Sequence, residues 1–182
     1  MPLEENDLIK GCLKGERHAQ EALYKQYASQ MYVVCLRYTR AQQEAEDILQ
    51  ESFIKVFKDL KSFKRNSSLF YWIKRVVINT ALNYQRSKLY LYPMVDVEEM
   101  KNTQSNEAKL SEYSMDELLQ MIQTLPQSSQ VIFNLYAIEG YKHKEIAEML
   151  EISEGTSKSQ FARARQLLQN KMQETKKNYG RG

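Results

Sequence analysis

The sequence predicts an all-α protein made of two small helical domains joined by a linker. Its 182 residues include only six Gly and three Pro, fewer than turn-rich β proteins contain. Apolar residues recur at steps of three and four along several stretches, which is the period of a helix with one buried face. This period breaks down around Pro93 and an acidic, polar run. We therefore expect an N-terminal helical bundle at 1–87, a linker at 88–115 and a helical domain at 116–182.

The first domain is expected to contain a short helix and three long ones. Asp7 can cap the short helix, Leu8–Leu13, which would end near Gly15. Three apolar stripes predict the long helices: Ala19, Leu23, Tyr27, Met31, Val34 and Tyr38; Leu49, Phe53, Val56 and Leu60; and Phe70, Ile73, Val77, Ala81 and Tyr84. The stretch 61–68 lacks this period and is expected to be a loop. Helices with such short connections favour a compact bundle.

The second domain is expected to end in a helix-turn-helix. Helices are predicted at Asp116–Thr124, Ser128–Glu139 and His143–Leu150, and a last one from Glu154 onward. Ser153 is a suitable N-cap for the last helix, which in this motif enters the DNA major groove. Its outer face is expected to present Lys158, Ser159, Gln160 and Arg163, side chains that suit phosphates and base edges. An ordinary helical hairpin is the alternative interpretation.

The composition favours a soluble, cytoplasmic protein without catalytic chemistry. Two Cys cannot build a disulfide framework, no apolar run reaches the ~20 residues that span a bilayer, and the N-terminus is acidic where a secretory signal is basic. His18 and His143 show no ligand spacing, and the chain has no Gly-rich phosphate loop. We therefore expect no catalytic residues, no metal site, no cofactor and no insertion into a membrane.

One helix carries a second, polar stripe that suits single-stranded nucleic acid. Trp72, Arg75, Asn79, Asn83 and Arg86 recur at steps of three or four, and Lys64 and Arg65 lie in the loop before them. Bases stack on aromatic rings, amides read base edges and cations follow phosphates. The residues from Lys55 to Lys88 include nine basic side chains and one acid, and those from Lys158 to Gly182 include seven and one. Alternatively, Trp72 belongs to the core and the charges are simply solvated.

The helix before this stripe offers a different kind of surface. Asp47, Gln50, Glu51 and Ile54 lie away from its main apolar stripe. An acidic face with one apolar residue favours docking to a basic protein helix over DNA binding. A solvated helix face is the alternative.

Three stretches together resemble the extracytoplasmic-function (ECF) sigma factors of bacterial RNA polymerase. They are 44–53 (EAEDILQESF), the pair FYWI and INTALNY within 70–84, and 145–165 with EIAEML, SEGT and RAR. The resemblance covers roughly 7–86 and 116–172. The sequence departs from the common family pattern at Asn83, where many members have Asp, at Ser157, where an apolar residue is usual, and at Gln160, where Arg is frequent.

The resemblance implies a function for each surface. Asp47, Gln50, Glu51 and Ile54 would bind the clamp coiled coil of core RNA polymerase. The flap of core polymerase is a further expected contact. Phe63, Lys64, Arg65, Trp72, Arg75, Asn79, Asn83 and Arg86 would melt and read the −10 promoter element. Lys158, Ser159, Gln160 and Arg163 would read the −35 element. Many family members are also held by an anti-sigma factor, so a partner of this kind is expected, with the protein nucleoid-associated when bound to polymerase.

Two other functions remain open at this point. A helix-turn-helix regulator that acts without polymerase would not need the acidic face around Glu51, so reversing that charge should leave its activity intact. A helical protein–protein adaptor would ignore nucleic acid altogether, and its binding would not depend on salt as DNA binding does.

Overall fold

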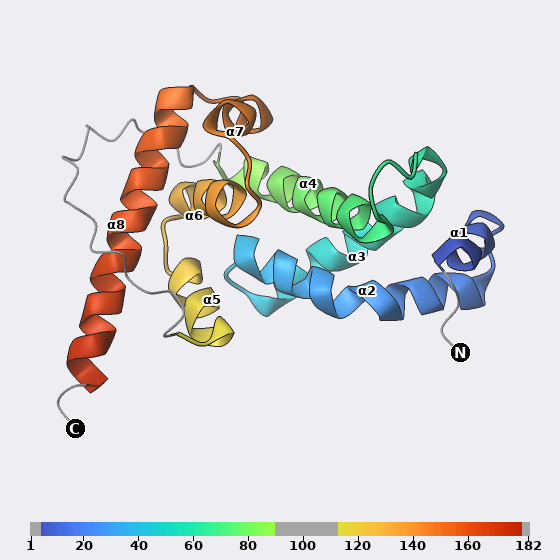
Figure 1. Cartoon of the computed structure of the whole chain (residues 1–182), viewed down its shortest axis with the longest axis horizontal. Helices are drawn as coiled ribbons and strands as arrows, with labels where there is room; N and C mark the ends of the chain where they lie inside the picture. The colour runs from blue at the N-terminus through green and yellow to red at the C-terminus, as the bar shows by residue number, and fades with distance from the viewer. Residues whose placement is uncertain (1–4, 90–112, 180–182) are drawn as a thin grey trace. The chain divides into compact units, whose positions relative to one another are not determined.

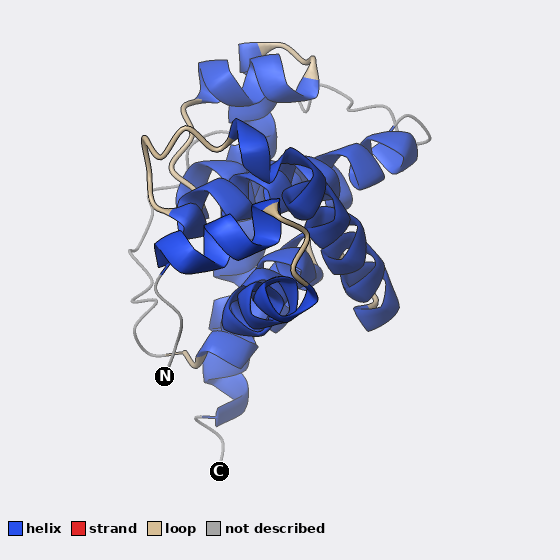
Figure 2. Cartoon of the chain, turned by 90° about the vertical axis from the view of Figure 1, so that its right-hand side faces the viewer, coloured by secondary structure: helices blue, strands red, loops and turns tan. Residues whose placement is uncertain are grey.

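The computed structural model describes residues 5–89 and 113–179, and within these ranges it contains helices and loops but no strand (Figure 2). The predicted all-α class is confirmed. The chain divides into two compact units, Met1–Gln85 and Arg86–Gly182. The predicted linker at 88–115 falls almost wholly outside the described residues, so its boundaries stay predictions.

The first unit begins with two helices that a short turn connects. Helix α1 spans Glu5–Leu13 and α2 spans Arg17–Tyr38. Gly15 takes a left-handed φ of +76°, which glycine adopts without the strain that a side chain causes, and this conformation turns the chain. The prediction that Asp7 caps α1 is wrong. The helix starts at Glu5, three residues before the predicted Leu8, and Asp7 lies in its first turn, where its carboxylate is 3.8 Å from the Lys10 ammonium.

Two further long helices complete this unit (Figure 1). Helix α3 spans Gln42–Asp59, the short 3₁₀ helix η1 spans Leu60–Ser62, and α4 spans Leu69–Leu89. Helix α2 packs on both α1 and α3. All six members of the apolar stripe predicted for α2 are buried. The buried Gln85 amide of α4 donates a hydrogen bond to the Tyr38 carbonyl at the end of α2. The inner faces of three helices thus form one core.

In its described residues 113–179, the second unit contains four α-helices and one turn of π-helix. Helix α5 spans Met115–Gln123, α6 spans Gln127–Phe133, the π-helical turn η3 spans Asn134–Ile138, α7 spans His143–Leu150 and α8 spans Glu154–Tyr179. A capping box starts α5, because Ser114 Oγ accepts from the Glu117 N–H while the Glu117 carboxylate accepts from the Ser114 N–H. The prediction of a single helix at Ser128–Glu139 is wrong, because the α-helix ends at Phe133 and the π-helical turn follows it.

The long helix α8 is the element on which the others in this unit pack (Figure 1). It contacts α5, α6 and α7. One buried apolar cluster joins α5 to the middle of α8 and comprises Met121, Leu125, Ala164, Leu168 and Met172. This packing leaves one side of the N-terminal half of α8 open to solvent. In the described part of the chain, no helix is both long and apolar enough to cross a bilayer.

Candidate functional site

The acidic face of α3 stands clear of the core of the first unit. Asp47, Gln50, Glu51 and Ile54 are all exposed, and Ile54 exposes 68% of its surface. Gln50 and Glu51 follow Asp47 by three and four residues, and Ile54 follows Glu51 by three, so all four lie on one side of the helix. The opposite side is buried and contains Ala45, Ile48, Leu49, Ser52, Phe53 and Val56. An isolated large apolar side chain among carboxylates suits contact with a protein partner.

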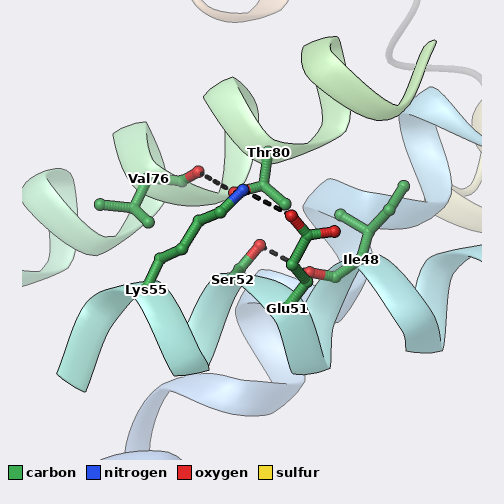
Figure 3. Close-up of polar contacts among 6 residues, drawn as sticks. All are labelled: Ile48, Glu51, Ser52, Lys55, Val76 and Thr80. Carbon is green, nitrogen blue, oxygen red and sulfur yellow. Dashed lines mark hydrogen bonds and ion pairs between the residues drawn. The ribbon is translucent and has the colours of Figure 1, made fainter. Parts of the chain in front are cut away.

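One member of this acidic face is linked to α4. The Lys55 ammonium lies 2.6 Å from the Glu51 carboxylate and 3.4 Å from Thr80 Oγ1, to which it donates (Figure 3). Thr80 Oγ1 in turn donates to the Val76 carbonyl of its own helix, at 2.9 Å. Lys55 exposes only 35% of its side chain. Lys55, one of the nine basic residues between Lys55 and Lys88, therefore bridges α3 and α4.

The polar stripe of α4 is largely exposed. Arg75, Asn79 and Asn83 are open to solvent, whereas Trp72 and Arg86 are half-buried. The Trp72 ring packs against Phe63, with ring centroids 5.5 Å apart at an interplanar angle of 46°. Trp72 is thus neither a fully buried core residue nor a free stacking platform. The two asparagines are the amide-bearing members of this stripe, and both are exposed.

The loop between η1 and α4 is tied to the first helix of the unit. Lys64 and Arg65 are exposed. Arg65 has a φ of +58°, a left-handed conformation that non-glycine residues adopt at a cost. Its guanidinium Nη1 donates to Asn6 Oδ1 at 2.9 Å, and η1 also contacts α1. The hydrogen bond from Arg65 to Asn6 therefore links the loop to α1 and helps to hold the loop conformation.

The predicted turn of the helix-turn-helix is present in the second unit. Helix α7 ends at Leu150, the C-cap residue Glu151 has a left-handed φ of +57°, and α8 begins at Glu154. Ser153 Oγ accepts from the Thr156 N–H at 2.9 Å, so Ser153 caps α8 as predicted. Ile146 of α7 and Ala164 of α8 are fully buried. Helices α7 and α8 are in contact.

The predicted outer face of α8 is wrong at one position. Gln160 is 1% exposed, and its Oε1 accepts from Ser129 Oγ at 2.7 Å and Ser128 Oγ at 3.3 Å. Lys158 is exposed and pairs with Glu154 at 2.8 Å. Ser159 and Arg163 are half-buried. Gln160 therefore anchors α8 to α6 and cannot read a base from this position.

The exposed face of α8 includes residues that the sequence analysis missed. Ala162 and Arg165 are exposed, and Gly155 is exposed one turn before Lys158. At about 100° per residue, Ala162 lies near the middle of this face, with Arg163 and Arg165 on its two edges. The spacing of Lys158, Ala162 and Arg165 is that of one helix face and could have identified it. The sequence did not distinguish this face from the opposite one, because the buried residues there are also polar.

A histidine occupies the contact between η3, α7 and α8. His143 Nδ1 is 2.9 Å from the buried Ser157 Oγ, and its ring stacks on Tyr136 with centroids 4.2 Å apart. Burial, and secondarily the nearby Lys158 ammonium, hold the pKa of His143 below its usual value. The buried Ser157 hydroxyl thus has a polar partner in the half-buried His143 ring. His143 is part of the packing between these elements.

The other reactive residue types are also accounted for by packing. Both cysteines are buried and unbridged. Burial raises the pKa of the Cys35 thiol to about 12 and also raises that of Cys12, so both thiols stay protonated at neutral pH. No group of three or more metal-ligating side chains occurs among the described residues.

Each of the two units contains a region that matches a known protein family. The family "Sigma-70 region 2" matches residues 23–89, and "Sigma-70, region 4" matches residues 115–168. The chain is 30% identical over 183 residues to the ECF RNA polymerase sigma-E factor of Salmonella typhimurium, covering 94% of this chain and 95% of that protein. It is 28% identical over 184 residues to the Haemophilus influenzae protein of the same name, covering 94% and 96%.

The fold is also similar to that of a solved sigma factor. The structure of RpoE from Bartonella quintana, in complex with the anti-sigma factor NepR, matches with a TM-score of 0.51 and 18% identity, covering 82% of this chain and 94% of that one. The chain belongs to the ECF family of RNA polymerase sigma factors, and it is a sigma factor that directs promoter-specific transcription.

Proposed function

We propose that the acidic face of α3 is the surface that docks on core RNA polymerase. The observation that supports this role is the exposure of Asp47, Gln50, Glu51 and Ile54 on one side of the helix. Carboxylates around one apolar anchor are complementary to a basic, partly apolar helix such as a coiled-coil surface. The clamp coiled coil of the polymerase is the proposed partner.

The α4 stripe and the loop before it are the proposed −10 surface. The exposed amides of Asn79 and Asn83 can each pair with the edge of an unstacked base. Lys64 and Arg65 in the loop and Arg75 on the same helix are exposed and suit the phosphates of a single strand, whereas Arg86 donates to the Met149 carbonyl at 2.8 Å. Trp72, supported by Phe63, offers an aromatic edge beside the amides. This surface would hold a base displaced from the nontemplate strand, which favours the melted state of the promoter.

The exposed face of α8 is the proposed −35 surface. Lys158 and Ser159 lie in the first turns of the helix, close to where a recognition helix enters the major groove. Arg163 and Arg165, on the two edges of the face, suit the phosphates that border the groove. Gln160 leaves the set because it is buried. Base readout would therefore depend on fewer side chains than the sequence predicted.

Catalysis belongs to the polymerase in this scheme. Sigma factors are not a family of catalytic enzymes, and we propose that this chain selects and opens the promoter while the core enzyme forms the phosphodiester bonds. Its action would take place in the cytoplasm. An anti-sigma factor is a further proposed partner, since the Bartonella sigma factor was solved with one.

A charge reversal at the docking face tests the proposal. Glu51→Lys should weaken binding to purified bacterial core polymerase and reduce run-off transcription in parallel. Glu46→Lys is the matched control, because Glu46 is an exposed acid of the same helix that lies off this face. Equal core binding by both variants and the wild type would remove α3 as the docking element.

A further inference from the structure

The bridge between α3 and α4 joins the two proposed surfaces of the first unit. Glu51, at one end, belongs to the proposed docking face, and Thr80, at the other, directly follows Asn79 and lies one turn before Asn83 (Figure 3). Lys55 stands between them with its ammonium in reach of both oxygens. Thr80 is 1% exposed and its hydroxyl proton is committed to the Val76 carbonyl, so its oxygen is oriented to accept from Lys55.

We propose that Lys55 is a positioning residue that couples polymerase docking to promoter opening. It partly neutralises Glu51 in the free protein, and it anchors the segment of α4 that carries the two asparagines. When a basic group of the polymerase approaches Glu51, it competes with Lys55 for the carboxylate. The ammonium then keeps Thr80 as its remaining partner. This inference rests on the proposed docking role of Glu51 and goes beyond it, because it assigns Lys55 an action through Glu51 and Thr80.

The proposal predicts effects of opposite sign for one substitution. Lys55→Met keeps a long apolar stem but removes the charge, so Glu51 becomes fully available to a basic partner. Core affinity should then rise, by about two- to fivefold, the range that an exposed ion pair contributes. Promoter opening at saturating holoenzyme should fall, because α4 has lost its tether to α3. A residue with only a structural role would lower both quantities together.

Three further variants separate the two ends of the bridge. Lys55→Arg retains charge and reach and should behave as the wild type does in both measurements. Thr80→Val removes the accepting oxygen, so it should reduce opening but leave core affinity unchanged. Lys25→Met is the matched control, because Lys25 forms the same kind of 2.6 Å ion pair with Glu21 one turn away, on α2. It should change neither readout.

The experiment measures core binding by fluorescence anisotropy of labelled protein and opening by permanganate reactivity of the −10 region. Thermal unfolding of each variant checks the fold, and Thr80→Val tests the α4 end independently if Lys55→Met fails to fold. Glu51→Gln shows whether a negative result concerns the docking role of Glu51 or the coupling role of Lys55. If it leaves core affinity unchanged, the docking role of Glu51 is wrong. If it weakens core binding while Lys55→Met neither raises core affinity nor reduces opening, the role of Lys55 is overturned.

Discussion

Helices α4 and α8 carry the two proposed DNA surfaces, yet their buried sides are built differently. The inner face of α4 is mainly apolar, with Leu69, Ile73, Val77 and Ala81 at or below 1% exposure. The inner face of the first turns of α8 is polar and includes Ser157 and Gln160. Helix α4 is oriented by the hydrophobic effect, whereas this part of α8 is oriented by hydrogen bonds to α6 and α7. Apolar spacing therefore identifies the exposed side of α4 but not that of α8.

The largest expected effect is on stability, and it comes from removing the buried Gln160 amide of α8. Gln160→Ala leaves the Ser129 hydroxyl without its 2.7 Å acceptor and opens a cavity. We expect the free energy of unfolding to fall by about 2 kcal/mol, since a lost buried hydrogen bond and a cavity both contribute. Urea denaturation of the full chain measures it. Lys158→Ala, at an exposed position, should change stability by less than about 0.5 kcal/mol. Equal, small changes in both variants would mean that Gln160 faces solvent.

A loss of function without a loss of stability is expected on α4. Asn79→Ala should reduce opening of the −10 region about tenfold, because one base-edge contact contributes about 1–3 kcal/mol. The exposed position of Asn79 should keep the unfolding midpoint at the wild-type value. Permanganate footprinting with saturating core polymerase measures the opening. Gln43→Ala, which removes an exposed amide from the start of α3, is the control. Unimpaired opening in Asn79→Ala would exclude Asn79 from base recognition.

The edges of the α8 face should contribute through charge. Arg163→Ala and Arg165→Ala are each expected to weaken holoenzyme binding to a −35 element. Each should also lower the slope of log affinity against log salt by about one, because one phosphate contact is lost. Filter binding or anisotropy over a salt series measures the slope. An unchanged slope in either variant would remove that arginine from the phosphate contacts.

The smallest expected effect is a pH dependence at the contact of α7 and α8. Because the pKa of His143 is lowered in the folded state, the unfolded chain takes up the proton first as the pH falls. The contribution of His143 to stability should be constant above about pH 6.5, the unfolded value, and be lost progressively below it. His143→Phe keeps an aromatic ring against Tyr136 and should remove this part of the slope. Unfolding curves between about pH 5.5 and 7.5 avoid the titration of the carboxylates.

Apolar periodicity was enough to predict the helices of the first unit and the bounds of α7, which match at His143–Leu150. It could not locate the start of α1, because a capping preference for Asp does not distinguish the N-cap from the first turn. It also missed the π-helical turn after Phe133, which interrupts a continuous helical pattern.

The site residues also fall into two groups: those whose exposure follows from apolar spacing, and those whose position depends on polar partners. Exposure of the α3 face and of the two asparagines follows from where the apolar stripes lie. The burial of Gln160 and the bridging position of Lys55 depend on partners on other helices, Ser129 and Thr80. Such partners are many residues away in sequence, so a charge count or a helical wheel does not detect them. The sequence pattern is therefore most informative where burial is apolar.

The most direct test of the central claim, that the two units read separate promoter elements, is run-off transcription from a promoter library randomised at both. Purified core polymerase would be combined with wild type, Asn79→Ala or Lys158→Ala. We predict core-dependent, selective transcription by the wild type, with sequence preference lost only at the −10 element in Asn79→Ala and reduced only at the −35 element in Lys158→Ala, because Lys158 lies where the helix enters the major groove. Loss of preference at the same element in both variants, or selection that does not depend on the added chain, would contradict it.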